Sequence, residues 1–293
     1  MSWNYQSAPS ITDQEYVRWE QMLEHRTGIH FASHRAILRT ALLRRMREIE
    51  CSSFDEYYRR VCGFTSAADQ EWTILINGLT VRETRFFRHP AAFGCVRRFL
   101  LDRWMMDSDR PLQLWSAGCS SGEEAYALAF VAAECEAYSG RKREVRVIGS
   151  DISETALNEA REAVYPATRI SHMTPAQQAR FVEPVENNKY RVKPEFKSGV
   201  EFRQGNLGTL VLEPGSCDVV FCQNVLIYFR SPHRETVLEN LVDALRPGGL
   251  LVTGSGETPG WAASRLVRLA DSQVQAWVRR ADNDNELTGV NHG

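Results

Sequence analysis

The chain has 293 residues, a formal net charge of −2 and a pI near 6.4. This near-neutral balance argues against a protein that mainly coats nucleic acid, because phosphate binding needs a concentrated positive field. No apolar run approaches the roughly 20 residues of a membrane span, and the first ten residues lack a signal-peptide pattern, so the sequence predicts a cytoplasmic protein without membrane insertion.

Residues 1–85 predict a small helical domain. Thr12 and Asp13 are good caps for an amphipathic run that Gly28 ends. The apolar periodicity predicts three further helices, at 33–49, 53–61 and 67–79. The second of these also carries an arginine-rich face that includes Arg35, Arg39 and Arg45.

From Pro111 onward, strand-like and helix-like segments alternate, which predicts an α/β domain over 86–280 with a doubly wound parallel sheet. Residues 171–200 interrupt this alternation. They contain a short helix and an alternating stretch around Asn187 and Asn188, so we expect a small inserted β-subdomain with a hairpin there. The polar residues 281–293 predict a flexible tail.

Gly118 and Gly122 bound a turn between a strand and a helix, the place where an open parallel sheet binds its ligand. The turn lacks the full GxGxxG pattern of pyrophosphate-binding sites. Taken alone, an ordinary strand–helix turn explains it equally well. Asp151 ends the next strand, where an acidic residue typically holds ribose hydroxyls, although it is also a credible helix cap near Ser153. Together the two features favour a nucleoside cofactor.

Glu123 and Glu124 open the helix after this turn. The helix dipole alone explains acidic residues there, but a carboxylate also suits a cationic cofactor, and we assign that role to Glu123. The seven cysteines contain no CxxC pair, so we expect reduced thiols and no metal site.

The segment TVRETRFFRHP, residues 80–90, joins the two predicted domains. Phe86 and Phe87 are expected to be packing residues. Arg88 is either an ordinary ion pair at the domain junction or the partner of a carboxylate, for which its rigid fork is well suited.

Five segments in order, TVRETRFFRHP, WSAGCSSGEEAYALA, GSDIS, CQNVLIYF and LRPGGLLV, resemble the motif series of CheR-type chemoreceptor methyltransferases. The resemblance extends over about residues 16–280. It implies a class I, Rossmann-like methyltransferase domain with a helical leader and a small β-subdomain. It also implies methyl transfer from S-adenosylmethionine to glutamate side chains of bacterial chemoreceptors, which gives glutamate methyl esters in sensory adaptation.

The resemblance also implies the site residues. Arg88 and Tyr228 would lie nearest the transferred methyl group. The cofactor would be bound by Thr84, Arg88, Glu123, Asp151, Asn206, Leu207, Gln223 and Asn224, with Asn206 and Leu207 near the adenine. The arginines of the second helix would meet the acidic helical cytoplasmic part of a receptor, although a solvated helix face is the plainer interpretation. We expect a monomer.

Two departures from the family pattern leave alternatives open. The family commonly has Asn where this chain has Arg82, and Arg where it has Gln223. The first alternative is therefore a non-catalytic module that binds S-adenosylmethionine or docks on receptors. The second is a methyltransferase for RNA or a small molecule, and the third is a relative that serves another chemosensory array.

Overall fold

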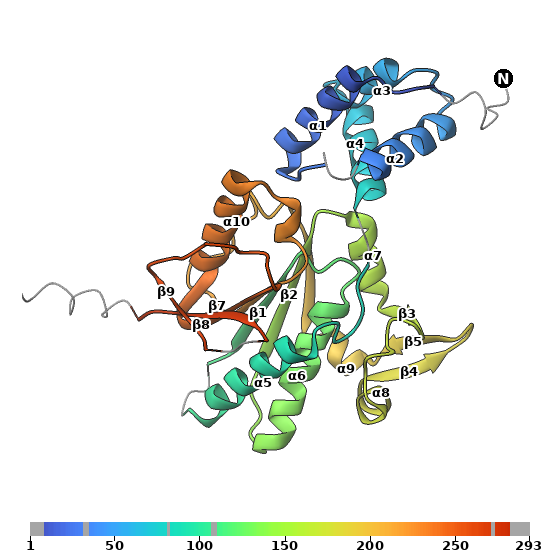
Figure 1. Ribbon diagram of the computed structural model, residues 1–293. Coiled ribbons are helices and arrows are strands. Elements are labelled where there is room, and N and C mark those ends of the chain that lie inside the picture. Colours follow the sequence, from blue (N-terminus) through green and yellow to red (C-terminus); the bar gives the residue numbers. More distant parts are fainter. Residues whose placement is uncertain (1–8, 32–34, 81–82, 107–109, 271–272, 282–293) are drawn as a thin grey trace, which may run out of the picture.

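The computed structural model describes residues 9–31, 35–80, 83–106, 110–270 and 273–281 (Figure 1). The tail predicted at 281–293 lies outside the described residues except for Ala281, as does Arg82. Among the helices within these ranges, none has both the length and the apolar character of a membrane-spanning segment.

The first four helices form the helical domain: α1 Asp13–Thr27, α2 Arg35–Glu48, α3 Phe54–Val61 and α4 Ser66–Leu79. Thr12 caps α1 through a reciprocal pair of hydrogen bonds with Glu15, and Gly28 ends it at φ +74°. Trp19, at the centre of the domain's core, is fully buried and packs against Tyr57 with ring centroids 5.5 Å apart. The predicted helices are confirmed.

The sheet domain has seven strands in the order β6-β2-β1-β7-β8-β10-β9. The strands are β1 Leu112–Ala117, β2 Val145–Asp151, β6 Val200–Gln204, β7 Cys217–Cys222, β8 Leu245–Thr253, β9 Leu266–Arg268 and β10 Gln275–Arg279. The first five strands in this order pair in parallel, and β10 runs antiparallel to both of its neighbours. The α/β, Rossmann-like fold is confirmed, with one antiparallel strand that the sequence pattern did not reveal.

Two layers of helices cover the sheet. Leu114, Phe221 and Val252 point to the face where α5 Pro90–Met105 and α6 Glu123–Ser139 pack. Trp115, Val220 and Leu251 point to the other face, which α10 Ser231–Ala244 covers. Such fully buried strands read as nearly continuous apolar runs, which is why the sequence pattern revealed them. Two short elements, α7 Glu154–Glu162 and the 3₁₀ helix η3 Leu226–Tyr228, follow β2 and β7.

A second sheet has the strand order β3-β5-β4 and lies to one side of the large one (Figure 1). It comprises β3 Val164–Pro166, β4 Val182–Val185 and β5 Lys189–Val192, accompanied by α8 Pro175–Phe181 and α9 Pro194–Lys197. The predicted turn is present, because Asn187 and Asn188 both have positive φ. The third strand, β3, lies entirely before the insertion bounds 171–200 that the sequence suggested.

The end of α1 contacts the sheet domain directly. Ile29 forms an isolated antiparallel bridge with Phe229, and the His30 N–H donates to the Tyr228 carbonyl at 2.7 Å. These contacts place the helical domain above the carboxyl edge of the parallel strands.

Candidate active site

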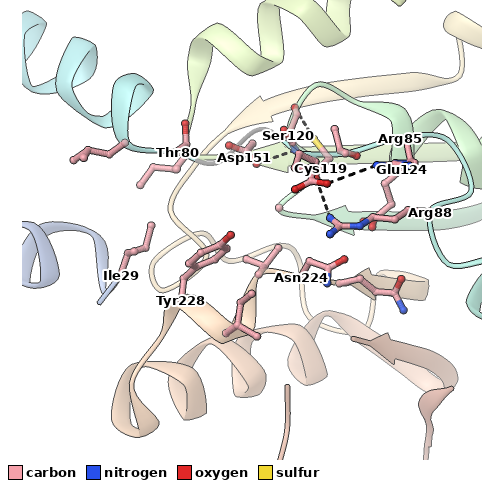
Figure 2. Close-up of a pocket in the computed structure, with 18 of the residues that line it drawn as sticks. Ile29, Thr80, Arg85, Arg88, Cys119, Ser120, Glu124, Asp151, Asn224 and Tyr228 are labelled. Atoms are coloured by element: carbon pink, nitrogen blue, oxygen red, sulfur yellow. Dashed lines mark hydrogen bonds and ion pairs between the residues drawn. The ribbon is translucent and has the colours of Figure 1, made fainter. Parts of the chain in front are cut away.

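A cavity lies at the carboxyl edge of β1, β2 and β7, where the strand order reverses between β1 and β7 (Figure 2). Open parallel sheets bind ligands at such a switch point. The helical domain also contributes to the wall, through Ile29, Ile37 and Leu79. Six of the predicted site residues line it: Thr84, Arg88, Asp151, Gln223, Asn224 and Tyr228. Glu124, the neighbour of the predicted Glu123, also lines it.

The glycine turn after β1 has no room for larger residues. At Gly118, which has φ +83°, a Cβ atom would lie 2.4 Å from the Val225 side chain. At Gly122, with φ +91°, it would lie 2.7 Å from the Ala160 Cβ. Ser120 between them also has positive φ, and its Oγ is buried without a hydrogen-bond partner among the described residues. The turn therefore brings the backbone close to the cavity, with the Ser120 hydroxyl buried within the turn.

Asp151 ties the end of β2 to this turn. Its Oδ2 accepts from the Ser120 N–H at 2.8 Å, and its Oδ1 accepts from the Ser153 N–H at 2.9 Å. Burial raises the pKa of Asp151, while the N–H groups of Ser153, Ser120 and Ile152 act against that rise. Each carboxylate oxygen retains acceptor capacity for a ligand hydroxyl.

The two glutamates at the start of α6 have different environments. Glu124 lines the cavity, and its Oε1 accepts a hydrogen bond of 2.6 Å from Ser116 Oγ. Glu123 is fully buried behind the wall, where it accepts from Ser121 Oγ at 2.8 Å and lies 3.5 Å from Arg169. No local pattern distinguishes these neighbours, and the geometry places Glu124, in place of the predicted Glu123, where a cationic ligand would be.

Arg88 and His89 extend from the domain junction into the cavity. Arg88 Nη1 donates to the Glu83 carbonyl at 2.8 Å, and His89 Nε2 lies 2.9 Å from Asn224 Oδ1. Phe86 and Phe87, between Thr84 and this pair, are buried as expected for packing residues. His89 was not among the residues predicted for the site. A histidine before a proline at the start of a helix does not by itself indicate a site residue.

The segment after β7 carries three of the predicted residues. Gln223 is buried, with its Nε2 donating to the Thr253 carbonyl at 3.3 Å. Asn224 adopts φ +60°, a left-handed conformation that asparagine tolerates better than most residues. Tyr228 is half-buried, and burial raises its pKa while the nearby Arg88 lowers it.

Asn206 and Leu207 lie elsewhere. Asn206 Nδ2 donates to the Arg26 carbonyl at 3.3 Å, so this side chain joins the end of α1 to the sheet domain. Leu207 packs in the apolar layer beneath α10. Neither belongs to the set of described residues that lines the cavity.

The three arginines of α2 that were predicted to contact a receptor also differ from one another. Arg45 Nε and Nη2 bind Glu71 at 2.6 and 2.9 Å, inside the helical domain. Arg35 contacts Glu20 and Asp13, each at 3.3 Å. Arg39 is exposed.

Two family models match the chain. The model described as "CheR methyltransferase, all-alpha domain" matches residues 14–80, and that described as "CheR methyltransferase, SAM binding domain" matches residues 82–274. The chain belongs to the CheR methyltransferase family. It is therefore an S-adenosylmethionine-dependent methyltransferase by family, as the motif series indicated.

Named relatives of this family align over most of the chain. Chemotaxis protein methyltransferase 2 of Pseudomonas aeruginosa is 35% identical over 90% of this chain and 92% of its own length. Chemotaxis protein methyltransferases of Salmonella typhimurium and Escherichia coli are both 32% identical, over 88% and 85% of this chain and 87% and 85% of their own lengths.

The cavity has the chemistry that S-adenosylmethionine requires of a CheR methyltransferase. Asp151 would hold ribose hydroxyls, the Gly118 turn would pass close to the ligand, and Glu124 would face its positive charges. Among the described residues no group of three or more His, Cys, Asp or Glu side chains is arranged to hold a metal ion.

Proposed function

We propose that this protein transfers the methyl group of S-adenosylmethionine to glutamate side-chain carboxylates of bacterial chemoreceptors, which gives glutamate methyl esters. The observation that carries the proposal is the position of the cavity, which has walls from both the methyltransferase sheet and the helical domain. A helical receptor segment that docks beside α2 would thus reach the site of methyl transfer. The names of the aligned relatives support the same pathway.

A glutamate acceptor fits a site in which catalysis consists of aligning the two reactants. Its carboxylate is already ionised near neutral pH, since the ordinary pKa of a glutamate side chain is about 4.3, so the reaction needs no general base. When bound, S-adenosylmethionine supplies an electrophilic methyl group on a sulfonium. The protein's task is then to orient two oppositely charged groups and to exclude water from between them.

Named residues divide this task. Arg88 uses one donor on the Glu83 carbonyl, and we assign the rest of its fork to the acceptor carboxylate or the cofactor's own carboxylate. Tyr228, half-buried beside Arg88, shapes the methyl-transfer site. Asp151, Glu124, Thr84 and the Gln223–Asn224 segment hold the cofactor.

The partner is the helical cytoplasmic part of a receptor, met by a monomer in the cytoplasm. Arg39 and Arg35 are both exposed on α2, so they are the candidates for electrostatic docking. Arg45 is assigned a structural role instead, because its guanidinium is bound to Glu71 and Glu48.

Kinetics of two variants test these roles. Arg88→Ala should lower kcat/KM for receptor methylation by about 100-fold, the usual effect of removing a preorganised charged donor. Tyr228→Phe should give a smaller loss. Arg98→Ala, which removes an exposed arginine of α5, is the matched control. Full turnover by both site variants would refute the assignment, and cofactor binding by the wild type without any transfer would indicate a regulatory module instead.

A further inference from the structure

Glu257 is a buried carboxylate that the proposed mechanism leaves unexplained. It follows β8 at the carboxyl edge of the sheet and is 1% exposed, although glutamate is rarely so deeply buried without a dedicated partner. Its partners are backbone N–H groups. Oε2 accepts from the Gly254 N–H at 2.8 Å, in a contact so close that a Cβ on Gly254 would lie 2.3 Å from this oxygen.

The segment that carries the site also acts on this carboxylate. Burial raises the pKa of Glu257, whereas the N–H groups of Gly254, Asn224, Ile227 and Val225 lower it. Oε1 is buried without a hydrogen-bond partner among the described residues. The strand register sets Cys222 beside Thr253, so the Gly254 contact places the carboxylate next to the chain that leaves β7. The carboxylate thus sits behind the backbone of the loop 224–228.

This loop needs such support. Asn224 has φ +60°, and the following residues turn through the short helix η3 before the chain reaches Tyr228. Backbone N–H groups that are buried without an acceptor cost free energy, and a carboxylate is the acceptor that stabilises several of them at once. The Asn224 side chain is fixed in turn by His89, because its Oδ1 lies 2.9 Å from His89 Nε2 and can accept the ring N–H.

We propose that Glu257 is a positioning residue, whose buried carboxylate holds the loop 224–228 so that Asn224 and Tyr228 face the cavity. The inference rests on the proposed roles of those two residues. The negative charge of Glu257 also extends into the cavity, where it raises the pKa of both Glu124 and Tyr228. Glu257 therefore contributes to the negative electrostatic potential in the cavity, although it would not contact a cationic cofactor itself.

Amide hydrogen exchange tests the positioning directly, without any turnover. Glu257→Gln keeps the shape but places an amide NH₂ among backbone donors. We expect exchange of the 224–228 amides to accelerate by about 10-fold or more, as local opening becomes easier. Glu239→Gln, an exposed glutamate on α10, should leave exchange unchanged. Equal exchange in Glu257→Gln and wild type would overturn the proposal.

Kinetics and pH supply a second readout. Glu257→Gln should lower kcat by about 10- to 100-fold, because small displacements of site residues have effects of this size. It should also move the midpoint of pH-dependent S-adenosylmethionine binding to lower pH. The charge of Glu257, which raises the pKa of Glu124, is then gone, while Arg88, which lowers that pKa, and Glu123, which raises it, remain. Loss of a merely structural contact would not shift this midpoint. Unchanged kcat together with an unchanged midpoint would contradict the proposal.

Gly254→Ala decides the matter if Glu257→Gln does not fold. The added Cβ would displace the carboxylate while Glu257 keeps its charge, so exchange at 224–228 should accelerate and kcat should fall. Unaltered exchange in this variant would overturn the proposal equally. If the wild type binds cofactor but methylates no receptor, only the proposed function is refuted. The positioning role of Glu257 is still tested, because hydrogen exchange does not depend on turnover.

Discussion

Ser116 Oγ donates a hydrogen bond of 2.6 Å to Glu124 Oε1 at the floor of the cavity. Ser116 is fully buried at the end of β1, so this contact fixes the glutamate side chain against the sheet. Burial raises the pKa of Glu124 to about 8, partly opposed by the Ser116 hydrogen bond, while the negative charge of Glu257 raises it further. The cavity is thus set to bind either a proton or a cation at this carboxylate.

The first prediction is that S-adenosylmethionine binding releases a proton. Below pH 8 Glu124 is mostly protonated, and a sulfonium favours the ionised form. Affinity should therefore rise with pH up to about 8 and then level off. Calorimetry in buffers of different ionisation enthalpy measures the proton release.

Two comparisons sharpen this prediction. Glu124→Gln should bind more weakly and without this pH dependence. S-adenosylhomocysteine, whose sulfur is uncharged, should show a smaller dependence in the wild type. A pH-independent affinity for S-adenosylmethionine between pH 6 and 9 would show that Glu124 does not face the cofactor's charge.

Asp151 should be needed for cofactor affinity. Asp151→Asn removes one acceptor oxygen and the charge, so either a backbone donor at Ser120 or Ser153 or a ribose hydroxyl loses its partner. We expect the Kd for S-adenosylhomocysteine to rise by at least about 10-fold. Asp102→Asn, an exposed position on α5, serves as the control. Equal affinities in the two variants would contradict the assignment.

His89 should act through Asn224. The 2.9 Å contact fixes the Asn224 amide, so His89→Ala should weaken cofactor binding by about 2- to 10-fold, the range for one hydrogen bond. A double-mutant cycle with Asn224→Ala separates this from general damage. Non-additive losses are expected. Strictly additive ones would mean that the two side chains act independently.

Arg39 and Arg45 should give opposite phenotypes. Arg39→Glu reverses an exposed charge on α2, so receptor methylation should fall while cofactor affinity and stability stay unchanged. Arg45→Ala leaves Glu71 buried without its cation and should lower the free energy of unfolding by about 3 kcal/mol. Receptor methylation kinetics and thermal unfolding distinguish them. A stable Arg45→Ala variant with selectively poor receptor methylation would restore Arg45 to the docking surface.

Stability should also depend on pH through Glu124. Its folded-state pKa of about 8 exceeds the ordinary value, so the folded state holds a proton that the unfolded chain has lost. This contribution is fully present at pH values below the ordinary pKa and is lost as pH rises toward 8. Chemical denaturation across this pH range measures the free energy of unfolding of the wild type and of Glu124→Gln. The change of this free energy with pH should be smaller in the variant.

Local patterns in the sequence were sufficient for most of the architecture. Thr12 and Gly28 mark the ends of α1, and Asn187 and Asn188 mark the hairpin of the β-subdomain. The antiparallel strand β10 escaped detection because a short strand with a partly apolar pattern carries no sign of its direction. Strand β3 is only three residues long, too short for any periodicity.

The site itself was only partly predictable. Asp151 and the Gly118 turn could be paired from the sequence because both end parallel strands. The choice between Glu123 and Glu124 depends on a rotation of about 100° around α6, which the tertiary packing decides. Asn206 and His89 act through contacts with residues 180 and 135 positions away, respectively, and no local pattern encodes such pairings.

Carboxyl methylation of a receptor is the most direct test of the proposed function. Purified protein would be incubated with methyl-labelled S-adenosylmethionine and receptor-containing membranes, and the products would then be exposed to mild base. We predict label on a receptor band that base removes, as expected for a glutamate methyl ester. Base-stable label, or no label on any receptor despite measurable cofactor binding, would contradict glutamate methylation by this protein.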